Sequence, residues 1–100
     1  MPPLLPMTVH CEGDWRLIEQ LGEKQDFESE LNQLGFRHED FMLYIGVVSS
    51  KAPGRVHYDY YVTVANIATG QQRVYHGGPR HDWVKACARD LATGVFGKAV

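Results

Sequence analysis

A change of hydrophobic period between residues 57 and 96 constrains the fold of this chain more than any other feature. The segment His57–Ile67 alternates between two sets of side chains, as a β-strand with one buried face does. The residues on its expected core face are Tyr58, Tyr60, Val62 and Val64. The segment Arg80–Phe96 instead has a helical period. Its apolar residues, which share one arc of the helical wheel, are Trp83, Val84, Cys87, Ala88 and Leu91.

Two further strands flank the alternating segment. Phe41–Val48 is apolar at nearly every position, which predicts a strand covered on much of both faces. Arg73–His76 follows the turn signal Thr69-Gly70 and predicts an antiparallel return. Upstream, apolar spacings of three and four predict helices over residues 14–22 and 26–35, each ending at a glycine.

These elements predict one α+β domain over residues 1–100, with a three-stranded antiparallel sheet, helices packed on one face and the order (α)αβββα. Residues 1–12 are expected to form an irregular, proline-rich tail, and residues 13–100 a compact body, because prolines remove backbone donors. A brief extended piece at Thr8–Cys11 is an alternative for the end of this tail, although no partner strand is indicated.

The composition limits the class of protein. With 44% hydrophobic residues, the 100-residue chain suits one small soluble domain. No run approaches the roughly 18 to 20 apolar residues of a membrane span, and the start of the chain lacks a signal-peptide pattern. We therefore expect a cytoplasmic protein without a membrane partner. Cys11 and Cys87 lack a disulfide or C-x-x-C pattern, so we expect reduced thiols.

Charge is unevenly distributed along the chain. Residues 1–40 carry three basic and nine acidic side chains, a net charge of −6, whereas residues 41–100 carry seven basic and three acidic ones, a net charge of +4. This asymmetry indicates either an anion-binding half or two halves that attract each other within or between chains. Solvated faces that happen to segregate are an equally weighted alternative.

No pattern in the chain specifies a catalytic or cofactor site. The spacings of its five histidines match no zinc motif, and Gly77-Gly78-Pro79-Arg80 lacks the phosphate-binding glycine patterns. We therefore expect no metal and no cofactor, and the sequence identifies no small-molecule substrate. An enzyme interpretation rests on His57, Asp59 and His76 alone, and the apolar surroundings of Cys87 predict an unreactive thiol.

Aromatic residues of the sheet are candidates for contact with a partner. Tyr61 and Tyr75, together with Tyr44, are predicted to share a face with Arg73, a combination that stacks bases or anchors a protein. The alternative is that a helix covers this face, and we favour it because aromatic residues usually fill a packed face.

The order helix, strand, strand, strand, helix from Asp26 to Phe96 resembles the double-stranded-RNA-binding domain. The loop Pro53-Gly-Arg-Val-His57 is similar to the Gly-Pro-x-x-His loop of that family, and Arg80, Lys85 and Arg89 occupy the region of its basic cluster. The resemblance implies two helices on one sheet face and contacts with successive grooves of an RNA duplex. Here, however, the last helix opens with Arg80-His-Asp in place of consecutive lysines.

Three functions follow, in order of preference. The first is a small non-catalytic binding module that acts through protein–protein contact, with a protein partner or as a homodimer in which acidic and basic halves meet. The second is a nucleic-acid-binding domain; its candidate contact residues are Arg55, His57, Arg73, Arg80, Lys85 and Arg89. The third is an enzyme with a histidine-based site.

Overall fold

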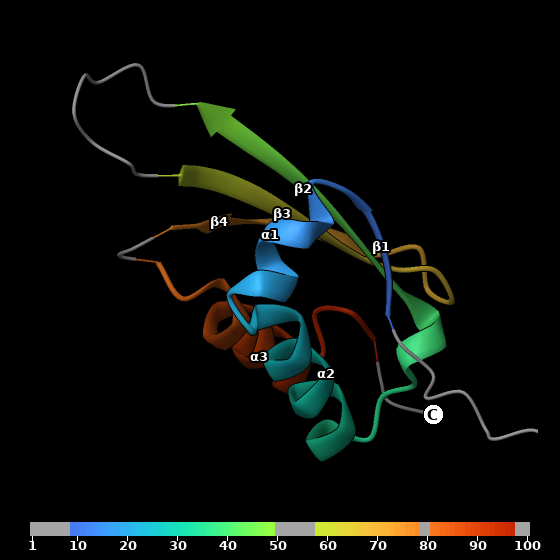
Figure 1. Cartoon of the computed structure of the whole chain (residues 1–100). Helices are drawn as coiled ribbons and strands as arrows, with labels where there is room; N and C mark the ends of the chain where they lie inside the picture. Colours follow the sequence, from blue (N-terminus) through green and yellow to red (C-terminus); the bar gives the residue numbers. More distant parts are fainter. Residues whose placement is uncertain (1–8, 50–57, 79–80, 98–100) are drawn as a thin grey trace, which may run out of the picture.

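A computed structural model describes residues 9–49, 58–78 and 81–97. Within these ranges, three α-helices lie on one side of a four-stranded sheet (Figure 1). In chain order the elements are β1 (His10–Gly13), α1 (Trp15–Gln20), α2 (Glu23–Leu34), a 3₁₀ turn (His38–Asp40), β2 (Phe41–Ser49), β3 (Tyr58–Asn66), β4 (Gln72–Gly77) and α3 (Trp83–Ala92). The strand order across the sheet is β1-β2-β3-β4.

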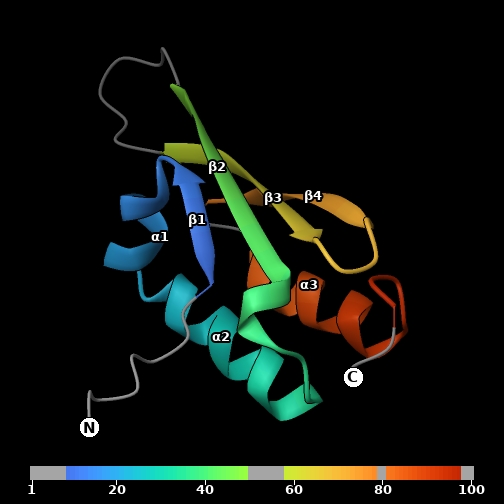
Figure 2. The same cartoon turned by 90° about the vertical axis from the view of Figure 1, so that its right-hand side faces the viewer.

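The predicted three-stranded antiparallel sheet is wrong, because the sheet is mixed and has a fourth strand. β2, β3 and β4 pair antiparallel, as expected, but β1 pairs parallel to β2, with Cys11 opposite Leu43. Residues 10–13 therefore belong to the sheet and not to an irregular tail. Figure 2 shows β1 alongside β2 at one edge of the sheet.

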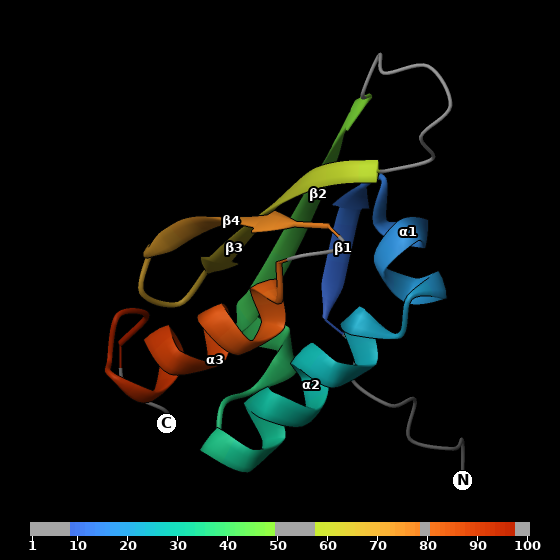
Figure 3. The ribbon, with the colours of Figure 1, turned by 90° about the vertical axis from the view of Figure 1, so that its left-hand side faces the viewer.

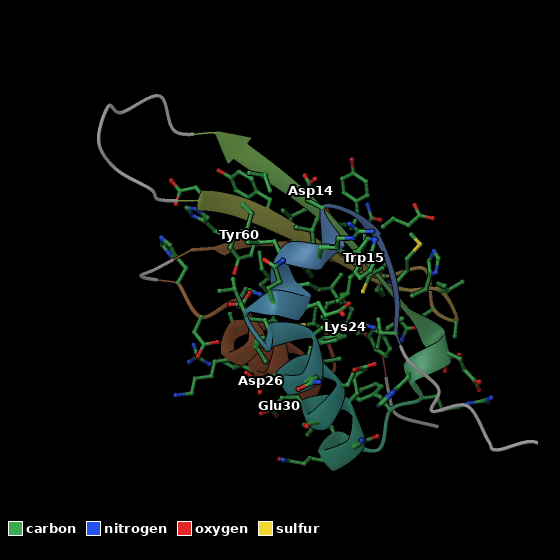
Figure 4. The ribbon with its side chains drawn as sticks, viewed as in Figure 1. Asp14, Trp15, Lys24, Asp26, Glu30 and Tyr60 are labelled. Atoms are coloured by element: carbon green, nitrogen blue, oxygen red, sulfur yellow. The ribbon has the colours of Figure 1, made fainter. Side chains whose placement is uncertain are left out.

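The parallel pair ends abruptly where β1 passes into α1. Gly13 pairs with Ile45 at φ 74°, and a Cβ at this glycine would overlap the Ile45 carbonyl group. The next residue, Asp14, donates its backbone N–H to the Ile45 carbonyl oxygen at 2.8 Å and accepts the Val47 N–H on its carboxylate at 3.3 Å. A side chain thus occupies the edge of β2 beyond the last β1 residue (Figure 4).

The other predicted strands and helices are present, although α2 begins at Glu23 and α3 covers only Trp83–Ala92. The segment predicted as a strand from its alternation contains β3 (Tyr58–Asn66), in which Tyr60, Val62 and Val64 are buried. The helical period at the end of the chain forms α3, whose Trp83, Val84, Cys87 and Leu91 are buried. Asp82 caps this helix by accepting the Lys85 N–H at 3.1 Å, which satisfies one of the unpaired donors of the first turn.

The core lies between the sheet and the pair α2 and α3, which run side by side beneath it (Figure 3). The rings of Phe27 and Trp83 meet there with centroids 5.6 Å apart. Glu23 joins three elements, because its carboxylate accepts the Trp83 Nε1–H at 3.0 Å and the hydroxyl hydrogen of Tyr60. Tyr60 thus points from the sheet into the helical layer (Figure 4). This network fixes both helices against the inner face of the sheet.

Candidate functional site

The face of the sheet that points away from the helices is the strongest candidate for a functional surface, and we call it the outer face. Strand register defines its residues, because every second side chain of each paired strand lies on the same side. They are His10 and Glu12 on β1, Met42, Tyr44, Gly46 and Val48 on β2, Asp59, Tyr61, Thr63 and Ala65 on β3, and Gln72, Val74 and His76 on β4.

Large apolar side chains of the outer face are exposed. The exposed fractions are 52% for Tyr44, 49% for Val48, 46% for Tyr61 and 62% for Val74. The expectation that β2 is covered on much of both faces is therefore wrong, and so is the preference for a helix over the aromatic face. The physical reason is topological, since α1, α2 and α3 all lie on the other side of the sheet (Figures 1 and 2).

One end of the outer face carries a column of aromatic rings. The imidazole of His76 stacks on the Tyr61 ring, with centroids 5.1 Å apart, and on the His81 imidazole, with centroids 4.1 Å apart. Nε2 of His76 lies 3.5 Å from Oδ1 of Asp59 and has no hydrogen-bond partner among the described residues. At the other end, Nε2 of His10 lies 3.1 Å from Oε1 of Glu12.

Tyr75 does not belong to this surface, so its prediction as an exposed contact is wrong. It pairs with Val62, which places it on the inner face, where it is only 9% exposed. Its hydroxyl donates to Oδ2 of Asp90 at 2.6 Å. The pKa of Tyr75 is raised well above its ordinary value, mainly by burial and secondly by this hydrogen bond. Tyr75 is thus a packing residue that joins β4 to α3, whereas Tyr61 and Tyr44 are exposed on the outer face as predicted.

The predicted basic contact residues do not gather on the outer face. Lys85 and Arg89 are exposed on α3, in the helical layer, and Arg73 occupies an inner-face register position opposite Val64. Arg55, His57 and Arg80 lie outside the described residues. No described position of the outer face is a lysine or arginine.

Two residues of the enzyme interpretation, Asp59 and His76, do lie next to each other in the structure, but on an open sheet face. A groove of about 470 Å³ lies elsewhere, around α1 and the uncovered end of β2; the residues that line it are Gly13, Asp14, Trp15, Arg16, Leu17, Gln20 and Val47. Neither Asp59 nor His76 contributes to it. Within the described ranges, no group of three or more histidine, cysteine or acidic side chains is arranged to hold a metal ion.

Burial lowers the reactivity of the Cys87 thiol. Its side chain is fully buried on α3, and burial raises the pKa of its thiol from 9.0 to about 12. A thiol in this state is largely protonated at neutral pH and a poor nucleophile.

The raised pKa of Cys87 predicts a loss of stability in alkali. A group whose pKa is higher in the folded state stabilises the fold fully below its unfolded pKa, near 9, and loses that contribution as the pH rises toward 12. We expect Cys87 ionisation to remove about 2 kcal/mol by pH 10.5. Urea unfolding between pH 8 and pH 10.5 should thus show a shallower pH dependence for Cys87→Ala than for the wild type. Val84→Ala, on the same buried face, should keep the wild-type slope; equal slopes for all three proteins would contradict the prediction.

Comparisons with models of protein families, with curated proteins and with solved structures find no match to this chain. The resemblance to the double-stranded-RNA-binding domain therefore stays an expectation from the sequence. No helix in the described part of the chain is long and apolar enough to cross a membrane. The cytoplasmic location stays a prediction.

Sequence reasoning missed most of the outer face. Tyr44, Val48 and Val74 were not recognised as one exposed surface, and neither was the stack of His76 on His81. The available signal was in β2, where Met42, Tyr44, Gly46 and Val48 occupy even positions opposite to the buried Phe41, Leu43 and Ile45. Both sets are apolar, so alternation alone did not separate them.

Proposed function

We propose that this protein is a small non-catalytic binding module that acts through protein–protein contact, and that its partner is a second copy of the same chain. In this proposal the outer faces of two copies pack against each other as the two sheets of a β-sandwich do. The observation that carries the proposal is that β2 is apolar on both of its sides, whereas the helices of its own chain cover only one.

The composition of the outer face supports a protein interface. Its exposed apolar residues, Tyr44, Val48, Tyr61 and Val74, lie on three neighbouring strands, while polar residues such as His10, Glu12 and Gln72 lie on the edge strands. An apolar centre with a polar rim is the usual anatomy of a protein interface, and tyrosine is enriched among the residues that contribute most to binding. This face is therefore suited to excluding water against another protein.

The size of the face supports a dimer. Four strands about 4.8 Å apart, the longest with nine residues at about 3.3 Å each, span roughly 20 by 30 Å. The accessible area of such a surface is comparable to the roughly 800 Å² per partner that a stable interface buries. Packing the two faces would hence supply enough area without another element.

The distribution of charge favours a second copy of the chain. Such an interface uses the same surface twice, so a two-fold axis relates the two copies. An axis that runs along the strands, between β2 and β3, would lay β1 of one copy over β4 of the other. Glu12 on β1 would then approach the end of the second copy that carries His76 and His81. Acidic and imidazole groups at opposite edges make the face complementary to itself.

The same surface does not suit a nucleic acid. Affinity for a phosphate backbone depends on lysine and arginine, and the described outer face has neither, whereas it has Glu12 and Asp59.

The proposed dimer does not need the acidic half of one chain to meet the basic half of another. α2 from the acidic half already packs beside α3 from the basic half within one chain.

The proposal predicts that the mass measured by light scattering or sedimentation rises with protein concentration. Tyr44→Ala and Tyr61→Ala should each raise the dissociation constant of the dimer about 30-fold, the effect of losing about 2 kcal/mol at a central contact. Lys85→Ala, an exposed change on α3, is the matched control and should leave the dissociation constant unchanged. Circular dichroism checks that each variant is folded.

A strictly monomeric mass at millimolar concentration would contradict the proposal. Equal weakening by Lys85→Ala and Tyr61→Ala would place the contact on another surface.

A further inference from the structure

Each acidic side chain on the described outer face has a histidine of the same face beside it. Glu12 Oε1 lies 3.1 Å from Nε2 of His10, and Asp59 Oδ1 lies 3.5 Å from Nε2 of His76. The two pairs lie toward opposite ends of the face, on β1 and on β3 and β4. Histidine is the side chain whose charge ordinarily changes between pH 5 and pH 8.

The surroundings of each histidine are defined by the described residues. His76 is flanked by Asp59 and Tyr61 from β3 and by the His81 ring, with which it stacks at 4.1 Å. His10 is flanked by Glu12 and, across the parallel pair, by Met42. Lysine and arginine are missing from the described positions of this face, so among those positions only these imidazoles can compensate the two carboxylates.

Packing two outer faces together would remove these carboxylates from water. A carboxylate that leaves water without a compensating charge costs far more free energy than one that enters as part of a hydrogen-bonded ion pair. A proton on His10 or His76 turns the neighbouring contact into such an ion pair. For His76, protonation ensures that Nε2 carries a hydrogen to donate toward Asp59, whichever tautomer the neutral ring adopts. This nitrogen has no hydrogen-bond partner among the described residues. Protonation therefore lowers the cost of bringing the faces together.

We infer that contact between two outer faces is coupled to the protonation of His10 and His76, so that the chain dimerises more tightly at mildly acidic pH. The inference rests on the proposed function and adds a means of regulating it. Because the dimer binds more protons than two separate chains, mass action requires its dissociation constant to fall as the pH falls.

The test is the dissociation constant of the full chain by sedimentation at pH 7.5 and pH 5.5. The wild-type value is expected to fall at least about tenfold at the lower pH, which corresponds to one well-coupled proton. His10→Gln combined with His76→Gln should abolish this difference. Glu12→Gln combined with Asp59→Asn should give a tight dimer at both pH values, because no carboxylate then needs compensation.

A matched control separates this mechanism from a general effect of charge. Asp26→Asn combined with Glu30→Gln removes two acidic side chains from α2, in the helical layer (Figure 4), and should keep the pH dependence of the wild type. A dimer whose dissociation constant is the same at both pH values would overturn the inference and leave the proposed dimer standing. Monomers at both pH values, in the wild type and in Glu12→Gln with Asp59→Asn, would overturn both.

Discussion

Replacing Trp83 by alanine is expected to lower the free energy of unfolding by about 3 to 5 kcal/mol, the cost of deleting a large buried aromatic side chain. Trp83 is 1% exposed, packs on the Phe27 ring and donates its Nε1–H to Glu23 at 3.0 Å. The truncation would thus leave a cavity between α2 and α3 and remove one of the two hydrogen bonds to the Glu23 carboxylate. Urea unfolding at neutral pH measures the effect.

Trp83→Phe separates packing from hydrogen bonding at the same position. Phenylalanine keeps most of the ring contact with Phe27 but cannot donate, so we expect a loss of only about 1 to 3 kcal/mol. Glu23 still accepts the Tyr60 hydroxyl in this variant. Arg89→Ala, an exposed change on the same helix, should alter stability by less than about 0.5 kcal/mol. If Trp83→Ala matched Arg89→Ala, our description of the core would be wrong.

Gly77→Ala is expected to destabilise the fold by about 3 kcal/mol, although it adds a single methyl group. Gly77 pairs with Tyr60 at the end of β4, and a Cβ there would overlap the Tyr60 ring and lie 2.7 Å from its Cδ2 atom. The Tyr60 ring is buried and its hydroxyl is bonded to Glu23, so it cannot move aside freely. Overpacking of this kind forces side chains from their preferred rotamers or shifts the backbone.

Gly46→Ala is the matched control, because Gly46 also lies within a strand but on the outer face. Its Cβ would meet only the Tyr44 Cε1 atom, at an ordinary 3.9 Å. We expect this change to be neutral or to stabilise by up to about 1 kcal/mol, as the loss of a strand glycine does. Combining Gly77→Ala with Tyr60→Leu should cost less than the sum of the two single changes, since the clash disappears. Equal effects of the two glycine changes would contradict the predicted overlap.

Local periodicity was enough to predict the elements whose two sides differ in polarity. β3 alternates tyrosine and valine with polar residues, and α3 carries its apolar residues on one arc, so both elements were predicted. α3 (Trp83–Ala92) is nevertheless shorter than the predicted segment Arg80–Phe96. β1 has no such signal. It is four residues long, His-Cys-Glu-Gly, and its partner β2 begins at Phe41, so the pairing depends on contacts that only the folded chain brings together.

The face of a residue in β4 could not be predicted, because it depends on the register set by the β3–β4 turn. In the structure Tyr61 pairs with His76 and Val62 with Tyr75, which sends Tyr61 outward and Tyr75 inward. A shift of β4 by one residue would instead turn Tyr75 outward and His76 inward. The exposure of the outer face could not be predicted from the sequence for a different reason. An apolar strand in a sequence does not reveal whether its cover comes from the same chain or from another.

The Asp14 carboxylate at the end of β1 also affects how copies of this protein can assemble. An open strand edge invites the next chain to add on, and repeated addition builds fibres. Beyond Ile45, Asp14 accepts the Val47 N–H that an incoming strand would need. Growth through this side of the sheet is thereby discouraged, and a face-to-face pair that uses the same surface twice is complete at two chains. If two outer faces pair as proposed, this single aspartate would favour a closed particle of two chains over an open fibre.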